Sequence, residues 1–174
     1  MLCQVLDLKK MPTALPIKIT IYGYGRVGKP LVDMIKSDPN MKIVRIKTKT
    51  NDKILEDLDS DITIEAINNV NEAKDILKES MLNNQDVITC NKELIYLYRE
   101  ELFDIANKTK KTIYLNSIIA GHSSSEFKES LTHTNFESYI YLEPFKFRGA
   151  GGIETAKAIY EDILRYKNIV YGIL

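Results

Sequence analysis

Short apolar segments alternate with amphipathic ones along most of the chain. Residues 17–22 alternate apolar and polar side chains, which predicts a strand, and a glycine-rich turn then leads into a helical pattern that continues to Ile35. Further strands are predicted at residues 43–46, 62–67, 87–90 and 113–115. One helix follows a capping segment at 68–71 and ends near 83–84, and the next begins at 91–92 and ends around 108–111. This alternation predicts an α/β fold, a Rossmann-like doubly wound parallel sheet.

The same pattern divides the chain into four parts. Residues 1–16 contain two prolines and predict a loose N-terminal arm. Residues 17–121 hold the alternating strands and helices and form the predicted central domain. Residues 122–148 lose this rhythm and form a predicted insert. A second glycine turn, at 149–152, opens the predicted C-terminal helix of the part 149–174.

Composition narrows the class of protein without identifying a partner. The chain has 174 residues, 44% of them hydrophobic and 28% charged, which excludes disorder as the main state. Lys and Arg total 24, as do Asp and Glu, so we expect no bulk attraction to nucleic acid or to a membrane surface. Two cysteines without metal-ligand spacing, and no apolar run of about 18 residues, favour a cytoplasmic protein without a metal site.

The first glycine turn carries the strongest local motif. Gly23, Gly25 and Gly28 form a G-x-G-x-x-G pattern between a predicted strand and a predicted helix, the context that marks a dinucleotide site. The first glycine permits the tight turn, the second lets the backbone approach a diphosphate, and the third lets the helix pack closely on the strand. A purely structural turn is the alternative.

The residues after the second predicted strand bear on the choice of cofactor. A site for NAD places Asp or Glu about 20 residues after the motif, where it binds the ribose hydroxyls. This region instead contains Lys47 and Lys49, which together with Arg26 offer charge for a 2′-phosphate. The pattern favours NADP and leaves NAD possible, since the two lysines are also what a solvated strand end would show.

A lysine follows the strand predicted at 87–90. Lys92 stands at the start of a predicted helix, just outside the carboxyl edge of the sheet, where open α/β sheets bind their ligands. A lysine at this place can exchange a proton with a carbinol oxygen during hydride transfer if the cleft lowers its pKa. A surface lysine in a first helical turn is the alternative.

These segments, taken together and in order, resemble homoserine dehydrogenase. The similarity is carried by the glycine motif at 23–28, by I-E-A-I at 64–67 and by V-I-T-C-N-K-E-L at 87–94. It continues in residues 114–121, similar to the family's strand and turn toward its catalytic domain. The family's late G-A-G-G-x-x-T-A segment, where its chain returns to the nucleotide domain, is similar to residues 149–163.

The resemblance implies roles for individual residues. Residues 17–121 would form the dinucleotide-binding domain and Lys92 would lie at the hydride-transfer centre. The cofactor diphosphate would be held by Gly23, Gly25, Arg26, Val27 and Gly28. Thr89 and Asn91 would border the nicotinamide, and the cleft would be lined by Ser117, Gly121, Gly151 and Thr155, with Asn68 standing where the family has a glycine pair.

The resemblance has one large departure. In the family a long substrate and dimerisation domain separates the two matching regions, whereas residues 122–148 are all that fill this interval here, and the family's homoserine-binding stretches are not among them. Two functions therefore stay open. One is an NADP-dependent oxidoreductase, expected as a homodimer, that interconverts homoserine and aspartate 4-semialdehyde. The other is a non-catalytic, truncated homologue that binds NADP(H) or a protein partner.

Overall fold

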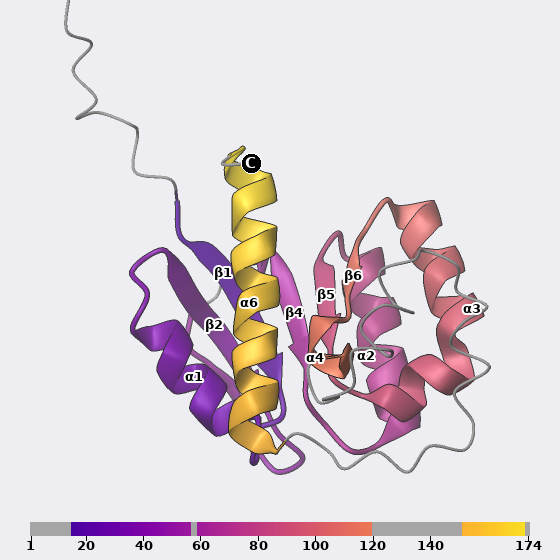
Figure 1. Ribbon diagram of the computed structural model, residues 1–174, viewed down its shortest axis with the longest axis horizontal. Helices are drawn as coiled ribbons and strands as arrows, with labels where there is room; N and C mark the ends of the chain where they lie inside the picture. Colours follow the sequence, from indigo (N-terminus) through magenta and orange to yellow (C-terminus); the bar gives the residue numbers. More distant parts are fainter. Residues whose placement is uncertain (1–14, 57–58, 120–150, 173–174) are drawn as a thin grey trace, which may run out of the picture.

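A mostly parallel sheet of six strands runs through the computed structural model, which describes residues 15–56, 59–119 and 151–172 (Figure 1). The strand order is β3-β2-β1-β4-β5-β6, and all neighbouring strands are parallel except β2 and β3. The strands are β1 (Ile17–Tyr22), β2 (Met41–Lys47), β3 (Asp52–Ile54), β4 (Ile62–Glu65), β5 (Asp86–Thr89) and β6 (Ile113–Tyr114).

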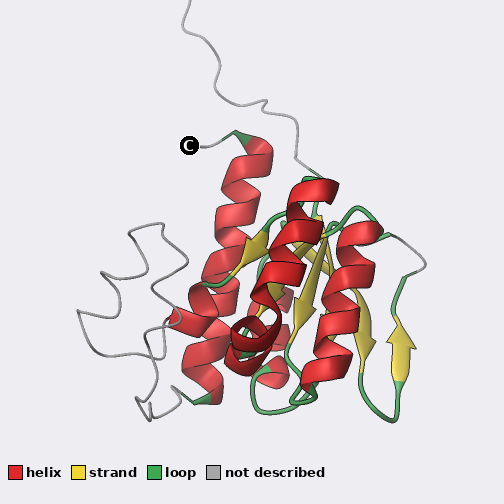
Figure 2. Ribbon diagram, turned by 90° about the vertical axis from the view of Figure 1, so that its right-hand side faces the viewer, coloured by secondary structure: helices red, strands yellow, loops and turns green. Residues whose placement is uncertain are grey.

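Helices cover both faces of this sheet (Figures 1 and 2). α1 (Gly28–Lys36) and α6 (Gly152–Tyr171) pack on one face, while α2 (Val70–Leu82) and α3 (Lys92–Thr109) pack on the other. Neighbouring residues of β5 show the division, since Ile88 joins the core beneath α1 and α6, and Val87 joins the core beneath α2 and α3. The predicted Rossmann-like α/β fold is confirmed.

Asparagine side chains set the starts of two helices. Asn69 accepts a hydrogen bond from the Glu72 amide at 3.2 Å and caps α2, and Asn91 accepts one from the Leu94 amide at 3.0 Å and caps α3. Both satisfy backbone donors that the first helical turn leaves unpaired. The helix starts predicted at 68–71 and 91–92 are confirmed.

Three details differ from the sequence-based expectations. The hydrophobic pattern did not predict β3, because all three residues of this strand are exposed and none forms a buried apolar face. The strand predicted at 62–67 ends at Glu65, and residues 116–119 form a short helix, α4 (Asn116–Ile119), where a strand and turn were expected. The predicted insert at 122–148 lies outside the described residues.

The chain order places a switch point in the middle of the sheet. β1 and β4 are hydrogen-bonded neighbours, and the chain continues from β1 to β2 on one side and from β4 to β5 on the other. Their carboxyl ends, Tyr22 and Glu65, are paired residues in the ladder. Open α/β sheets bind their ligands in the crevice outside such a point, so the site is sought there.

The helices also bear on a possible bilayer location. Within the described ranges, none of the helices combines the length and the apolar character needed to traverse a bilayer.

Candidate functional site

The glycine motif forms the turn that leaves the switch point. Gly23 has φ +104°, and a Cβ on it would lie 2.3 Å from the carbonyl oxygen of Ala66 in the loop after β4. Its amide donates to the carbonyl of Lys47 at the end of β2, 2.8 Å away. Gly23 therefore joins three strand ends, and no other residue fits this backbone.

The other two glycines meet different surroundings. A Cβ on Gly28 would lie 2.1 Å from the Gly23 carbonyl oxygen, so α1 and β1 approach each other as closely as the backbone permits. A Cβ on Gly25, by contrast, would meet none of the described atoms within 4 Å. Gly25 thus leaves open space at the surface of the turn, the position where a diphosphate approaches the backbone in dinucleotide sites.

The start of α1 is electrostatically suited to an anion. Its N-cap residue, Val27, gives no side-chain hydrogen bond to the helix, and its first turn has no acidic residue. α2 and α3 both have a capping asparagine and a glutamate in the first turn. The positive end of the α1 dipole is therefore left without a local negative partner, which favours phosphate binding.

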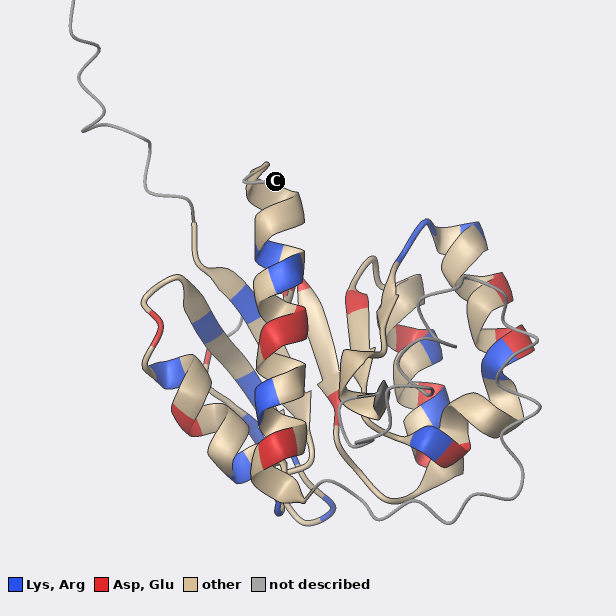
Figure 3. Cartoon of the chain, in the orientation of Figure 1, with Lys and Arg blue, Asp and Glu red and all other residues tan. Residues whose placement is uncertain are grey.

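Basic side chains surround this turn. Arg26 and Lys49 are exposed, and the ammonium of Lys47 lies 5.6 Å from the ring centroid of Tyr22. Lys47 ends β2 and is next to β1 in the sheet, so the structure brings it to the glycine turn as predicted from the sequence. Basic segments are visible at the edge where α6 begins, at the bottom of Figure 3.

Gly151 and Gly152, the described residues of the second glycine turn, lie directly against the first turn. A Cβ on Gly152 would lie 2.2 Å from the carbonyl oxygen of Arg26, and Gly151 has φ +95°. Thr155 donates its hydroxyl to the Gly151 carbonyl at 2.8 Å, one turn back in α6. The two glycine motifs are far apart in the sequence, yet the structure joins them at one edge of the sheet.

Lys92 is the first residue of α3, beside the end of β5. Although its side chain is exposed overall, partial desolvation by the protein lowers the pKa of its ammonium, and Cys90 opposes this effect. A lowered pKa makes the lysine a better proton-transfer group near neutral pH. The sequence-based placement of Lys92 at the carboxyl edge is thus what the geometry shows.

Two predicted cofactor residues are buried, with their side chains bonded inside the protein. Thr89 is fully buried and donates its hydroxyl to Glu65 at 2.5 Å, while Ser117 donates to the Thr89 carbonyl at 2.9 Å. Ser117 therefore attaches α4 to β5. Asn68 is exposed in the loop after β4, and Gly121 lies outside the described residues.

Glu65 is a residue of this site to which the sequence analysis assigned no role. Its side chain is 0% exposed, and burial raises the pKa of its carboxyl to about 7, against hydrogen bonds from Thr89 and from the Ile67 amide. The available signal was an acid within an otherwise buried parallel strand. Acids are rarely buried unless they have a specific partner or role.

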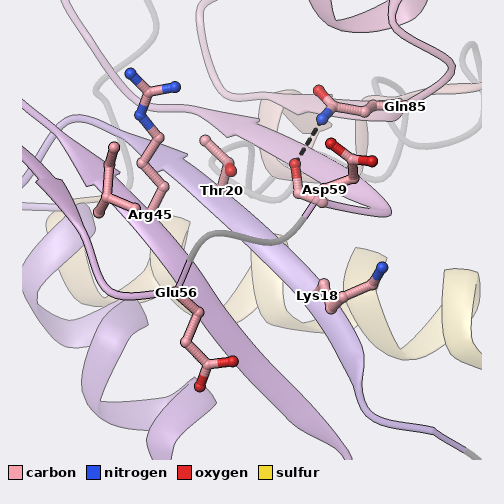
Figure 4. Close-up of a pocket in the computed structure, with 8 residues that line it drawn as sticks. Lys18, Thr20, Arg45, Glu56, Asp59 and Gln85 are labelled. Atoms are coloured by element: carbon pink, nitrogen blue, oxygen red, sulfur yellow. Dashed lines mark hydrogen bonds between the residues drawn. The ribbon is translucent and has the colours of Figure 1, made fainter.

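A separate hollow lies on the face of the sheet opposite α1 and α6 (Figure 4). Its volume is about 450 Å³, and it faces the strands β1 and β2 away from α1 and α6. The residues that line it are Lys18, Thr20, Arg45, Ile54, Glu56, Asp59, Ser60 and Gln85. Three of the charged lining residues, Lys18, Arg45 and Glu56, form ion pairs with Asp61, Asp52 and Lys42, so the hollow offers little free charge for a ligand.

A second buried acid supports the site from α6. Asp162 is 1% exposed, and burial raises the pKa of its carboxyl to about 6, despite hydrogen bonds from the amides of Asn116 and Ser117 and the nearby Arg165. Its Oδ2 has no hydrogen-bond partner among the described residues. Asp162 thus holds α4 onto α6 while keeping one oxygen unpaired.

We expect Asp162→Asn to remove a pH dependence of stability. Between about pH 4 and pH 6 the folded protein holds a proton on Asp162 that the unfolded chain has released, so raising the pH through this window lowers the free energy of unfolding. The Asp162→Asn variant has no such titration. Its free energy of unfolding, relative to that of the natural protein, should therefore rise by about 3 kcal/mol between about pH 4 and pH 6. Urea unfolding at both pH values measures it.

The exposed acid Asp33 on α1 provides the control for this measurement. Asp33→Asn should leave the pH dependence as it is in the natural protein. An unchanged pH dependence in Asp162→Asn would contradict the assignment of the buried charge.

Fold and site together define the class of protein. A switch point, a G-x-G-x-x-G turn with open space at Gly25 and an uncapped helix after it make this a Rossmann domain of the dinucleotide-binding type. Residues 44–116 match the family model described as homoserine dehydrogenase, NAD binding domain. Homoserine dehydrogenase of Bacillus subtilis (strain 168) is 32% identical over 68 residues, which cover 39% of this chain and 16% of that relative.

Solved structures agree on the fold. Homoserine dehydrogenase of Thermoplasma acidophilum has a TM-score of 0.55 at 17% identity, covering 61% of this chain and 44% of that one. A homoserine dehydrogenase from Thiobacillus denitrificans has a TM-score of 0.53 at 21% identity, and the match covers 61% of this chain and 30% of that one. A hyperthermophilic archaeal homoserine dehydrogenase in complex with NADPH has a TM-score of 0.53 at 16% identity, and the match covers 62% of this chain and 46% of that one.

These comparisons confirm the resemblance inferred from the motifs. The described domain is similar, in sequence over residues 44–116 and in fold over about three fifths of the chain, to the NAD-binding domain of homoserine dehydrogenases. The chain spans less than half the length of these relatives.

Proposed function

We propose that this protein is an NADP-dependent oxidoreductase of the homoserine dehydrogenase type, which interconverts homoserine and aspartate 4-semialdehyde by hydride transfer. The observation that carries the proposal is that Lys92 and the described residues of both glycine turns lie at the carboxyl edge of the same sheet. An NAD-binding domain accounts for the turns alone, whereas a lysine with a lowered pKa at the same sheet edge supplies a proton-transfer group.

The residues would divide the work between binding and chemistry. The turn at Gly25 and the start of α1 would hold the diphosphate, and Lys47 and Lys49 would hold a 2′-phosphate, as Arg26 would from the turn. When bound, the nicotinamide supplies or accepts the hydride. Lys92 then gives a proton to the aldehyde oxygen or takes one from the alcohol.

Substrate positioning is the remaining requirement. Hydride transfer needs donor and acceptor carbons about 3–3.5 Å apart, so a bound cofactor without a positioned substrate gives little rate. The insert at 122–148, or a second copy of the chain in a homodimer, would complete the substrate pocket. Without either, the protein would be a dinucleotide-binding homologue without turnover, an alternative favoured by the short interval between the two regions that resemble the family.

Turnover is tested directly by nicotinamide absorbance. Purified protein is incubated with homoserine and NADP, and NADPH binding is titrated in parallel by its fluorescence. Turnover with saturable binding supports the dehydrogenase. Binding without turnover supports the alternative, and neither activity would refute both functions.

The preference for NADP makes a separate prediction. The double variant Lys47→Ala and Lys49→Ala should bind NADPH about 10-fold more weakly, because one or two charge-assisted contacts to the 2′-phosphate are lost. Its affinity for NADH, which lacks this phosphate, should stay within about twofold. Fluorescence titration of both cofactors measures the difference.

Lys36 is the matched control, since it lies in the last turn of α1, at the far end of the helix from the glycine turn. Lys36→Ala should leave both affinities unchanged. Equal weakening of NADPH and NADH in the double variant would argue against a 2′-phosphate site.

A further inference from the structure

Glu65 occupies the carboxyl end of β4 at the switch point. Its Oε1 accepts a hydrogen bond from the Ile67 amide at 2.7 Å, in the loop that follows β4. Its Oε2 accepts one from the Thr89 hydroxyl at 2.5 Å, at the end of β5. One carboxyl therefore joins the two strand ends between which a nicotinamide site would lie.

The hydrogen bonds of Glu65 belong to a larger closed network. The Thr89 Oγ1 also accepts a hydrogen bond from the Asn91 amide at 3.0 Å, and the Asn91 Nδ2 donates to the Ile67 carbonyl at 3.5 Å. Glu65, Thr89, Asn91 and Ile67 thus form a closed ring of hydrogen bonds, which we call the Glu65 ring. It connects the loop after β4 with the loop after β5.

The Glu65 ring is directly connected to Lys92 through the backbone of Asn91. Asn91 belongs to the ring and also caps α3 through its Oδ1, which accepts from the Leu94 amide at 3.0 Å. Lys92 is the next residue and the first of the helix. A shift of the Glu65 ring therefore shifts the start of α3 and the backbone that carries Lys92.

Titratable neighbours of Glu65 come from three elements. Glu72 on α2 and Cys90 after β5 both interact unfavourably with its charge, and Tyr22 is its paired residue on β1. Two donors face the carboxyl and none of these neighbours is a cation. A buried acid in such surroundings is costly, which argues that the carboxyl has a role a neutral side chain would not fill.

We propose that Glu65 is a positioning residue that, through the Glu65 ring, sets the place of Lys92 relative to the cofactor. The inference rests on the proposed function for its effect on turnover, whereas the ring itself belongs to the free protein. It assigns to Glu65 neither contact with the substrate nor proton transfer to it.

The test compares Glu65→Gln with a control variant earlier in the same strand. Glu65→Gln keeps the shape but replaces an acceptor oxygen by an amide group that donates. Thr63→Val breaks another buried contact of β4, the 2.8 Å hydrogen bond from Thr63 to Gln85. Thr63 lies two residues before Glu65 and is not a member of the Glu65 ring, so its loss tests for general loosening alone.

We expect Glu65→Gln to lower kcat by about 10- to 100-fold, because a displacement of about 1 Å is enough for such a loss. Its Kd for NADPH should change by less than about threefold, since the diphosphate turn is not altered. Thr63→Val should keep kcat within about twofold. An unchanged kcat in Glu65→Gln, or an equal loss in Thr63→Val, would overturn the positioning role.

A second measurement uses the free protein and needs no turnover. The amide NMR signals of Ile67, Asn91 and Lys92 should titrate together near pH 7 in the natural protein and lose this titration in Glu65→Gln. If these signals do not move together, the Glu65 ring is refuted. If they do and the natural protein has no turnover, only the proposed function fails.

Thr89→Val provides a second route to the same conclusion if Glu65→Gln does not fold. It removes the donor to Glu65 and the acceptor for the Asn91 amide, and it should uncouple the Ile67 and Asn91 signals. Signals that stay coupled in this variant would overturn the proposal.

Discussion

Lys92→Ala should lower turnover of homoserine by about 10²- to 10⁴-fold, the range that general acid–base catalysis contributes. Lys92 begins α3 beside the end of β5, and partial desolvation lowers the pKa of its ammonium, so its neutral form is more accessible near physiological pH. Alanine leaves no group to exchange the proton. Absorbance at the reduced nicotinamide band measures the loss under saturating cofactor.

Two further variants separate chemistry from charge and from helix stability. Lys92→Arg keeps the positive charge but should not restore turnover, because a guanidinium does not release its proton. Lys108→Ala removes an exposed lysine in the last turn of the same helix and should have normal turnover. NADPH should bind Lys92→Ala about as well as the natural protein. Full turnover in Lys92→Ala would refute the proton-transfer role.

Gly28→Ala should destabilise the fold by about 3 kcal/mol or more, because the added methyl group meets backbone that has no room for it. The new Cβ would lie 2.1 Å from the Gly23 carbonyl oxygen, and the Gly23 backbone is itself held by the hydrogen bond from its amide to the Lys47 carbonyl. Neither side can move without separating α1 from β1. Urea unfolding followed by circular dichroism measures the change.

Gly25→Ala is the matched control, and we expect it to affect cofactor binding rather than stability. No described atom lies within 4 Å of the added methyl group, so the free energy of unfolding should change by less than about 0.5 kcal/mol. NADPH affinity should nevertheless fall at least about 10-fold, because the methyl group occupies the space through which a diphosphate approaches. A stable Gly25→Ala that binds NADPH normally would place the cofactor elsewhere.

The sequence predicted the central part of this fold well. Strand and helix alternation identified five of the strands, since buried parallel strands are apolar runs, and the asparagine caps identified the starts of α2 and α3. β3 was missed because an edge strand of exposed residues, stabilised in part by the Arg45 and Asp52 ion pair, has no hydrophobic pattern. Its pairing with β2 is a contact within the folded sheet that a hydrophobic pattern does not encode.

The site was predicted in part, and the division has a physical reason. Glycine spacing and a lysine after a strand are local signals, so the sequence located the turn of Gly23, Gly25 and Gly28 after β1 and Lys92 after β5. Contacts between segments are not local. The approach of Gly152 to Arg26, the burial of Thr89 and the partners of Glu65 all depend on how distant strands and loops meet.

The position of α6 also has a consequence for how the domain is assembled. Ala156, Ile159 and Ile163 of this helix share one core with Ile19 and Ile21 of β1, so contacts that complete the core join residues more than a hundred positions apart. Closing so long a loop is entropically costly and slow relative to local helix formation. Until α6 docks, α1 alone covers this face of the sheet, so part of the apolar surface of β1 stays exposed to solvent and favours aggregation of the incompletely folded chain.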